Sequence, residues 1–237
     1  MVVANTMEVA QLAFLNKNNF IMKIDKKIIL SSAPRSGSTF LIQIFKKLFR
    51  AVDQGHGYSS GVNVVVFRDF RDAALSTYRV DNNKKGCKPL NENFTISNPK
   101  ILSEIFKRYV RYVEMIEKFI DNNPKVLYFV YEFDIKSKTG NKYETIFSKI
   151  EDYFNIIIPE QKRQLVKEYT NFDENLIRSS KFNHWGEYDK DTLIHGTHLH
   201  KGGLNLWKKH IDSSLYNDSN FINWENRYKK CIKKIGY

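Results

Sequence analysis

The chain has 237 residues, 42% of them hydrophobic and 14% aromatic, which is enough apolar material for a folded core and argues against intrinsic disorder. A net charge of +12 predicts a polyanionic partner: nucleic acid, an anionic membrane, a charged glycan or a phosphate-rich cofactor. Two distant cysteines and the lack of a long apolar run argue against a disulfide framework, a zinc site, a signal peptide and a membrane anchor, so we expect a cytoplasmic protein.

The N-terminal half of the chain predicts alternating strands and helices. Short apolar, β-leaning runs predict strands, whereas apolar residues at helical spacing predict helices. The expected elements are a lead-in at 1–25, a strand at 27–33, a helix at 39–50, a loop at 51–61, a strand at 62–67, a helix at 71–79 and a polar, mobile loop at 81–98.

The C-terminal half predicts one further strand among helices. We expect helices at 99–120, 143–154, 159–169 and 215–235, a strand at 125–131, and a Gly- and His-containing loop at 183–203. The near-continuous apolar character of 62–67 predicts a strand that is buried on both faces, as in a parallel sheet. The alternation therefore predicts a single α/β domain with a central parallel sheet flanked by helices.

A phosphate-binding loop is predicted between the first strand and the first helix, at Pro34-Arg35-Ser36-Gly37-Ser38-Thr39. Gly37 permits a tight turn, and the free N–H groups of Ser38, Thr39 and Phe40 would point at an anion at the positive helix end. Arg35 adds a fixed charge. The GxxxxGK[ST] pattern of magnesium-dependent ATP enzymes is absent. The alternative is an ordinary helix N-cap beside an exposed Arg.

A second anion-binding pair is predicted at the end of the second strand. Arg68 follows that strand, at the edge where open α/β sheets bind ligands, and Ser76 lies eight residues further on in the next helix. Together they would clamp a phosphate. The alternative is a surface ion-pair patch formed by Arg68, Asp69, Arg71 and Asp72.

Four separated segments resemble one family, the PAPS-dependent sulfotransferases, where PAPS is 3′-phosphoadenosine-5′-phosphosulfate. Pro34 to Phe40 resembles the 5′-phosphosulfate loop, and Arg68 with Ser76 resembles the 3′-phosphate motif. Lys201-Gly202 with Trp207 is similar to the late R-K-G-x-x-x-x-W stretch, and Phe129 to Glu132 is similar to a strand ending in Tyr-Glu. The likeness spans most of the chain.

The chain also departs from the family pattern. Arg35 stands where the cytosolic members usually have Lys, Phe70 where Pro is frequent, and His200 where Arg precedes Lys-Gly. The Lys-Thr-Val-Glu dimer stretch is not visible after Trp207. The dimer of the cytosolic members is therefore not expected, and the oligomeric state stays open.

The resemblance implies a P-loop NTPase-like sulfotransferase fold and transfer of a sulfuryl group from PAPS, leaving PAP, to a hydroxyl or amine without a metal. The acceptor could be a small molecule, a glycan, a lipid or a protein. Phe40 would stack on adenine, with Tyr131 and Phe182 as possible companions, and the loop at 183–203 would cover the cofactor. The implied cofactor-binding residues are Arg35, Ser36, Gly37, Ser38, Thr39, Phe40, Arg68, Ser76, Tyr131, Lys201 and Gly202.

Two residues are expected to act in catalysis. Arg35 would stabilise the charge that grows on the leaving 5′-phosphate. His56, in the loop after the first helix, is the first choice for the base that takes the acceptor's proton. Weaker choices for the base are His184, His195, His198 and Glu132. No Cys or acidic residue is spaced to complete a metal site with the histidines at 195–200.

Two other functions stay open at this point. A P-loop kinase or other NTPase could use the same scaffold, although the Gly-Lys-Ser/Thr sequence and a Walker-B-like acid are missing. A basic nucleic-acid-binding protein would fit the net charge, but the aromatic residues mostly lie within periodic apolar runs rather than alternating with basic residues on one face. No nucleic-acid partner is therefore expected.

Overall fold

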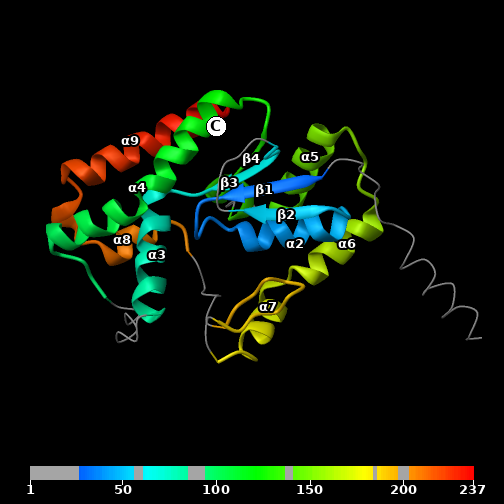
Figure 1. Ribbon diagram of the computed structural model, residues 1–237, viewed down its shortest axis with the longest axis horizontal. Helices are drawn as coiled ribbons and strands as arrows, with labels where there is room; N and C mark the ends of the chain where they lie inside the picture. Colours follow the sequence, from blue (N-terminus) through cyan, green and yellow to red (C-terminus); the bar gives the residue numbers. More distant parts are fainter. Residues whose placement is uncertain (1–26, 56–60, 85–93, 137–140, 184–185, 197–202) are drawn as a thin grey trace, which may run out of the picture.

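The computed structural model describes residues 27–55, 61–84, 94–136, 141–183, 186–196 and 203–237. Within this part of the chain, four parallel strands form one sheet in the order β2-β1-β3-β4 (Figure 1). The strands are β1 (Ile28–Ser32), β2 (Val52–Gly55), β3 (Val64–Phe67) and β4 (Leu127–Val130). Leu30 of β1 lies opposite Val64, and Val66 lies opposite Phe129 of β4.

Both faces of the central strand β3 are buried, which explains its continuous apolar sequence. Val64 and Val66 pack into one hydrophobic core, whereas Val65 and Phe67 point to the opposite face and pack into a second core. All four of these side chains are fully buried. The sheet is therefore the middle layer of a three-layer structure.

Helices cover the two faces of the sheet. The core on one side includes residues of α2 (Ser38–Leu48), α5 (Lys142–Phe154) and α6 (Glu160–Tyr169). The core on the other side includes residues of α3 (Phe70–Lys84), α4 (Pro99–Asn122) and α9 (Ser219–Lys234). The shorter helices are α7 (Phe172–Ser179), α8 (Leu206–His210) and a 3-10 turn at Ser213–Leu215 (Figure 1). The predicted α/β class with a central parallel sheet flanked by helices is confirmed.

Two predicted loops are partly wrong. The stretch 51–61 contains β2, a polar edge strand whose sequence lacks the apolar alternation of a buried strand but which pairs with β1 from Val52 to Gly55. The stretch 81–98 begins as helix, because α3 continues to Lys84. Ile96, near its end, forms a bridge with Ile211. The lead-in at 1–25 lies outside the described residues.

Further differences occur in the C-terminal half. The strand predicted to 131 ends at Val130, and Tyr131–Ile135 form a short π-helix. The helix predicted at 215–235 begins only at Ser219, because the Asp218 carboxylate caps it by accepting from the N–H groups of Asn220 and Phe221. Helices α7 and α8 were not predicted. Each is short, and short helices give a weak periodic signal.

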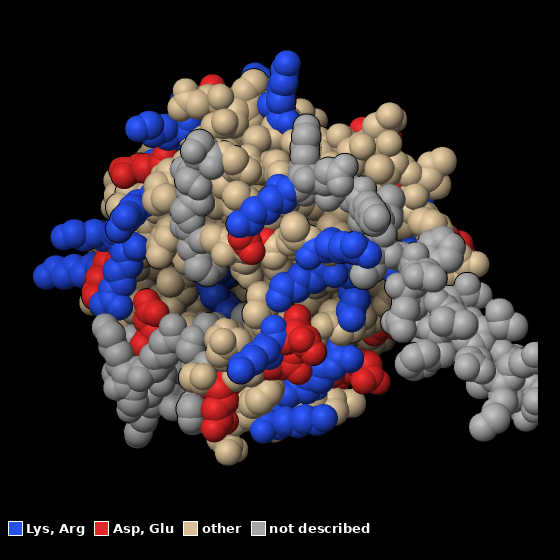
Figure 2. All heavy atoms as spheres, turned by 45° about the vertical axis from the view of Figure 1, so that its right-hand side comes forward, with Lys and Arg blue, Asp and Glu red and all other residues tan. Residues whose placement is uncertain are grey.

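Charged side chains are mixed on the face that Figure 2 shows, where Lys and Arg lie beside Asp and Glu. Opposite charges also pair elsewhere in the described chain, for example Arg163 with Glu144 and Glu151. Among the helices described, none is both long and apolar enough to cross a membrane.

Candidate functional site

A cavity of about 650 Å³ opens at the carboxyl edge of the sheet. Strand β1 leads into α2 on one face and β3 leads into α3 on the other, so the chain diverges at this edge and leaves a crevice there. Each strand contributes lining from its end: Arg35 after β1, Gln54 in β2, Arg68 after β3 and Tyr131 after β4.

The predicted phosphate loop forms one wall of this cavity. Gly37 is the N-cap of α2 with a φ of 87°, a left-handed conformation that favours glycine. A Cβ at Gly37 would lie 2.7 Å from Cδ2 of the Tyr131 ring, so the close approach of loop and ring also requires glycine. No side chain caps α2, and the N–H groups of Ser38 and Thr39 donate to no described residue. The loop therefore offers donors to an anion.

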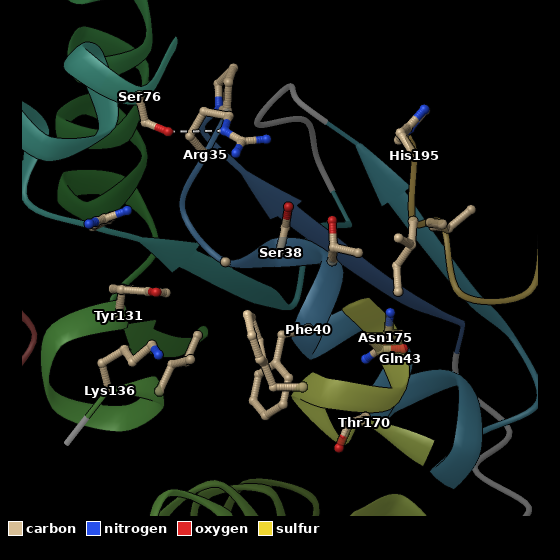
Figure 3. Close-up of a pocket in the computed structure, with 18 of the residues that line it drawn as sticks. Arg35, Ser38, Phe40, Gln43, Ser76, Tyr131, Lys136, Thr170, Asn175 and His195 are labelled. Carbon is tan, nitrogen blue, oxygen red and sulfur yellow. Dashed lines mark hydrogen bonds between the residues drawn. The ribbon is translucent and has the colours of Figure 1, made fainter. Parts of the chain in front are cut away.

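Arg35 lies beside this loop and reaches the second motif. Its φ of 65° is uncommon for a residue with a side chain and is a form of strain that concentrates at functional sites. Its Nε donates to Oγ of Ser76 at 3.2 Å (Figure 3). Burial, followed by the charges of Arg79 and Arg68, lowers the pKa of Arg35 to about 10, so it remains a cation at neutral pH.

Arg68 lies in a buried network of charges. Its Nη2 donates to Asp72 Oδ2 at 2.9 Å and to the carbonyl oxygen of Gly203 at 2.8 Å, and its guanidinium lies 4.5 Å from the centre of the Tyr131 ring. Burial opposes the charge of Arg68, but Asp72 and Glu132 outweigh it and raise the pKa of Arg68.

The alternative of a surface ion-pair patch is wrong. Arg68, Asp69, Arg71 and Asp72 are all 5% exposed or less. The reason is that α8 and α9 pack over the start of α3: Arg71 pairs with Asp69 and with Glu225 of α9. Buried charges of this kind persist only when they are paired.

The late motif meets the same network. The backbone N–H of Trp207 donates to Asp72 Oδ1 at 2.9 Å, and the Arg71 guanidinium lies 4.2 Å from the centre of the Trp207 ring. Gly203 accepts from Arg68, as described above. Lys201 and Gly202 themselves, like His200, lie outside the described residues. Gly203 and Trp207 of this motif are therefore hydrogen-bonded to residues that follow β3.

Two of the expected site residues differ from expectation. Ser36 is fully buried and is not among the residues that line the cavity. Phe182 does not line it either. The side chains of Ser38, Thr39, Phe40, Ser76 and Tyr131 do.

Several lining residues were missed by the sequence. Phe172 and Asn175 come from α7, which was not predicted, and Gln54 comes from β2, which was expected to be loop. Gln43 lies one turn after Phe40 in α2, on the same helix face, so the helical period would have identified it. Gln54 donates to Ser38 Oγ at 3.0 Å and so orders the loop.

The choices for the base are only partly described. His56, His184 and His198 lie outside the described residues, although Gln54 and Gly55, which end β2 just before His56, are described and Gln54 lines the cavity. His195 also lines the cavity, with its ring 5.0 Å from that of Tyr188.

Glu132 is a mostly buried carboxylate, with its side chain 16% exposed, and it does not line the cavity. It accepts from the N–H of Asp69 at 3.1 Å and from the hydroxyl of Tyr228 at 2.8 Å. Burial raises the pKa of Glu132 to about 7, although the bond from Tyr228 and the charge of Arg68 oppose this rise. Over the part of the chain that the structure describes, no three His, Cys, Asp or Glu residues gather as metal ligands would.

Comparison with known proteins finds a likeness in structure alone. No protein-family model matches the chain, and no curated protein matches it in sequence. Among solved structures, it is similar to mouse sulfotransferase SULT7A1 complexed with PAP, with a TM-score of 0.54 and 12% sequence identity over 90% of this chain and 86% of the mouse chain. The likeness shows that the α/β fold of this chain is a sulfotransferase fold.

Proposed function

We propose that the protein is a sulfotransferase that transfers a sulfuryl group from PAPS to a hydroxyl or amine of its acceptor. The observation that carries the proposal is the meeting of three segments that are far apart in the sequence. A hydrogen bond from Arg35 to Ser76 links the phosphate loop to the pair Arg68 and Ser76. A second bond, from Arg68 to Gly203, links that pair to the segment from Gly203 to Trp207. These three segments are the ones that resemble the PAPS-dependent family, and they follow one another along the chain in the same order as in that family.

The residues present fit a nucleotide with phosphates at both ends of its ribose. Ser38 and Thr39 offer N–H donors at a helix N-terminus, and Arg35 offers a charge for the 5′ end. Ser76 and Arg68 would hold the 3′-phosphate, together with Lys201 and Gly202. Phe40 and Phe172 offer aromatic faces for the base.

When bound, PAPS supplies an activated sulfuryl group on a 5′-phosphate. Arg35 would then stabilise the negative charge that develops on the leaving phosphate. Its forked donor set and its cationic state at neutral pH suit this role. Fixed cations and amide donors would stabilise this charge, as a metal ion does in enzymes that transfer a phosphoryl group.

His56 would take the proton of the acceptor. An imidazole titrates near neutral pH and can hold a proton during the reaction. The position of His56 directly after β2, whose Gln54 lines the cavity and binds Ser38, supports this choice. His195 is the second choice, because it lines the same cavity.

Two variants separate these roles in an assay with labelled PAPS. Arg35→Ala should lower both sulfuryl transfer and the slow hydrolysis of PAPS by about 10²–10³-fold, because the leaving phosphate is the same in both reactions. His56→Ala should lower transfer to an aliphatic alcohol by about 10²-fold or more, because the alcohol must lose a proton. The same variant should keep most of its activity on a phenol that is already ionised at the assay pH.

PAP affinity is the control for both variants, and it should fall only modestly in Arg35→Ala and stay unchanged in His56→Ala. Near-normal turnover of the alcohol by His56→Ala would remove His56 as the base, and His195→Ala is then the variant to assay. Retention of full PAPS hydrolysis by Arg35→Ala would contradict the role of Arg35.

A further inference from the structure

Two buried carboxamides lie side by side in the wall of the cavity. Gln43 of α2 is 1% exposed and Asn175 of α7 is 5% exposed, and both line the cavity. Asn175 Nδ2 donates to Gln43 Oε1 at 3.1 Å, which joins the two helices (Figure 3). Neither side chain takes part in the phosphate chemistry described above, so the presence of two polar side chains at a buried place needs another explanation.

The surrounding bonds fix the orientation of both amides. Gln43 Nε2 donates to the carbonyl oxygen of Thr192 at 2.8 Å, and Arg178 Nη1 donates to Asn175 Oδ1 at 2.9 Å. A carboxamide has two N–H donors and two carbonyl lone pairs. Each of these amides therefore keeps one N–H and one lone pair that no described residue uses.

Each of the two amides lies one helical turn from a phenylalanine of the cavity wall. Gln43 follows Phe40 by three residues in α2, and Asn175 follows Phe172 by three residues in α7. Residues three apart on a helix share a face, and all four side chains line the same cavity. A flat ring held by Phe40 and Phe172 would thus lie within one helical turn of both amides.

We propose that Gln43 and Asn175 recognise the edge of an adenine base, an inference that rests on the proposed use of PAPS. Adenine carries an amino donor beside a ring-nitrogen acceptor, and a carboxamide matches this pair with one lone pair and one N–H. A 6-oxo purine replaces the amino group with a carbonyl, which would face the amide lone pair without a proton between them. The base is thereby selected as an amino purine.

Binding of two matched nucleotides tests this inference. PAP and the inosine 3′,5′-bisphosphate differ only at the 6-position and the adjoining ring nitrogen, and we expect the wild-type protein to bind PAP at least about tenfold more tightly. Asn175→Asp keeps the size of the side chain and an acceptor for Arg178 but removes the N–H. In this variant PAP affinity should fall about tenfold, and the preference over the inosine nucleotide should largely disappear.

Asn171→Asp is the matched control, because Asn171 caps the same helix through Oδ1, and Asp caps equally well. This change adds the same charge to α7 outside the cavity lining, so the preference for PAP should persist. Gln43→Met is a second variant, for use if Asn175→Asp does not fold. Gln43→Met should also lose the preference for PAP over the inosine nucleotide. An unchanged preference in folded variants, or equal loss for both nucleotides, overturns the inference.

AMP and IMP separate this inference from the proposed function, because neither carries a 3′-phosphate. Wild-type protein that binds AMP more tightly than IMP, yet binds PAP no more tightly than AMP, supports base recognition and contradicts the use of PAPS. Wild-type protein that prefers PAP over AMP but does not distinguish AMP from IMP supports the cofactor and overturns the role of the two amides. Failure to bind any of these nucleotides contradicts both.

Discussion

Arg35 and Gly37 show how the phosphate loop depends on single residues. Both have a positive φ, 65° and 87° respectively, and they lie on either side of the buried Ser36. Gly37 meets this requirement without cost, whereas Arg35 holds a conformation that is unfavourable for a residue with a Cβ. The bond from Arg35 to Ser76 is one contact that helps to hold it there. Within this loop, the residue with the strained backbone is thus the one proposed to act in catalysis.

Replacing Gly37 should damage both stability and nucleotide binding. An added Cβ would meet the Tyr131 ring at 2.7 Å, in addition to the backbone strain at positive φ. We expect Gly37→Ala to lower the free energy of unfolding by at least about 2 kcal/mol and to weaken PAP binding strongly. Urea unfolding and calorimetric titration measure the two effects.

Gly61→Ala is the matched control for this change. Gly61 also has a positive φ, 97°, but its added Cβ would meet only Ile29 Cδ1 at an ordinary 3.6 Å. It should lose only about 1–2 kcal/mol of stability and keep its PAP affinity. Equal effects of the two substitutions would show that the contact between Gly37 and Tyr131 does not shape the site.

Among the elements, the π-helix after β4 places the mostly buried carboxylate of Glu132 beside Arg68. Burial raises the pKa of Glu132 from 4.5 to about 7, so the folded protein binds a proton that the unfolded chain releases between these values. Stability therefore falls as the pH rises from about 4.5 through 7. Glu132→Gln removes this titration, so the wild-type protein should lose stability relative to the variant as the pH rises.

Urea unfolding of both proteins at pH values spanning this range measures the difference. Glu160→Gln is a suitable control, because Glu160 is exposed to solvent in the first turn of α6. A constant difference in unfolding free energy between the wild-type protein and Glu132→Gln would contradict a raised pKa at Glu132.

The segment 195–203 is predicted to respond to the nucleotide. Its described end, Gly203, accepts from Arg68, and Lys201 and Gly202 are proposed cofactor ligands. Amide hydrogen exchange across 195–203 should therefore slow when PAP is added, while exchange within the C-terminal half of α9 stays unchanged as an internal reference. Equal exchange with and without PAP would count against Lys201 and Gly202 as ligands.

The elements also show what the sequence could and could not predict. Strand β3 is continuously apolar because both of its faces are buried, and β1 begins with three apolar residues, so pattern alone identified both. β2 was missed because it is a polar edge strand, defined by its pairing with β1 rather than by its composition. Helix α7 was missed because it is short, and with it Phe172 and Asn175.

The contacts around Arg68 were beyond the sequence for a different reason. The spacing of Arg68 and Ser76 predicted a pair at the end of a strand, and both residues do line the cavity. Burial of Arg68, however, depends on Gly203 and on the packing of α8 and α9, which come from the far end of the chain. Local patterns carry no information about such long-range contacts.

At the scale of the whole molecule, one edge of the sheet gathers the proposed chemistry. Among the residues that line its cavity, Arg35, Arg68, Arg79, Lys136 and Lys142 are cationic, and none is Asp or Glu. An excess of positive charge in a concave site attracts anions and concentrates them there. The positive net charge of the chain, +12, is thus also present locally in the cavity lining, which suits a nucleotide with several phosphates.

The central claim is that this cavity binds a nucleotide with a 3′-phosphate without a metal. The most direct test is the melting temperature of the protein in EDTA with PAP or with ADP, each over a range of concentrations. We expect PAP to raise the melting temperature at much lower concentration than ADP does, because Ser76 and Arg68 would hold a group that ADP lacks. Equal shifts with PAP and ADP, or a shift with PAP that requires magnesium, would contradict it.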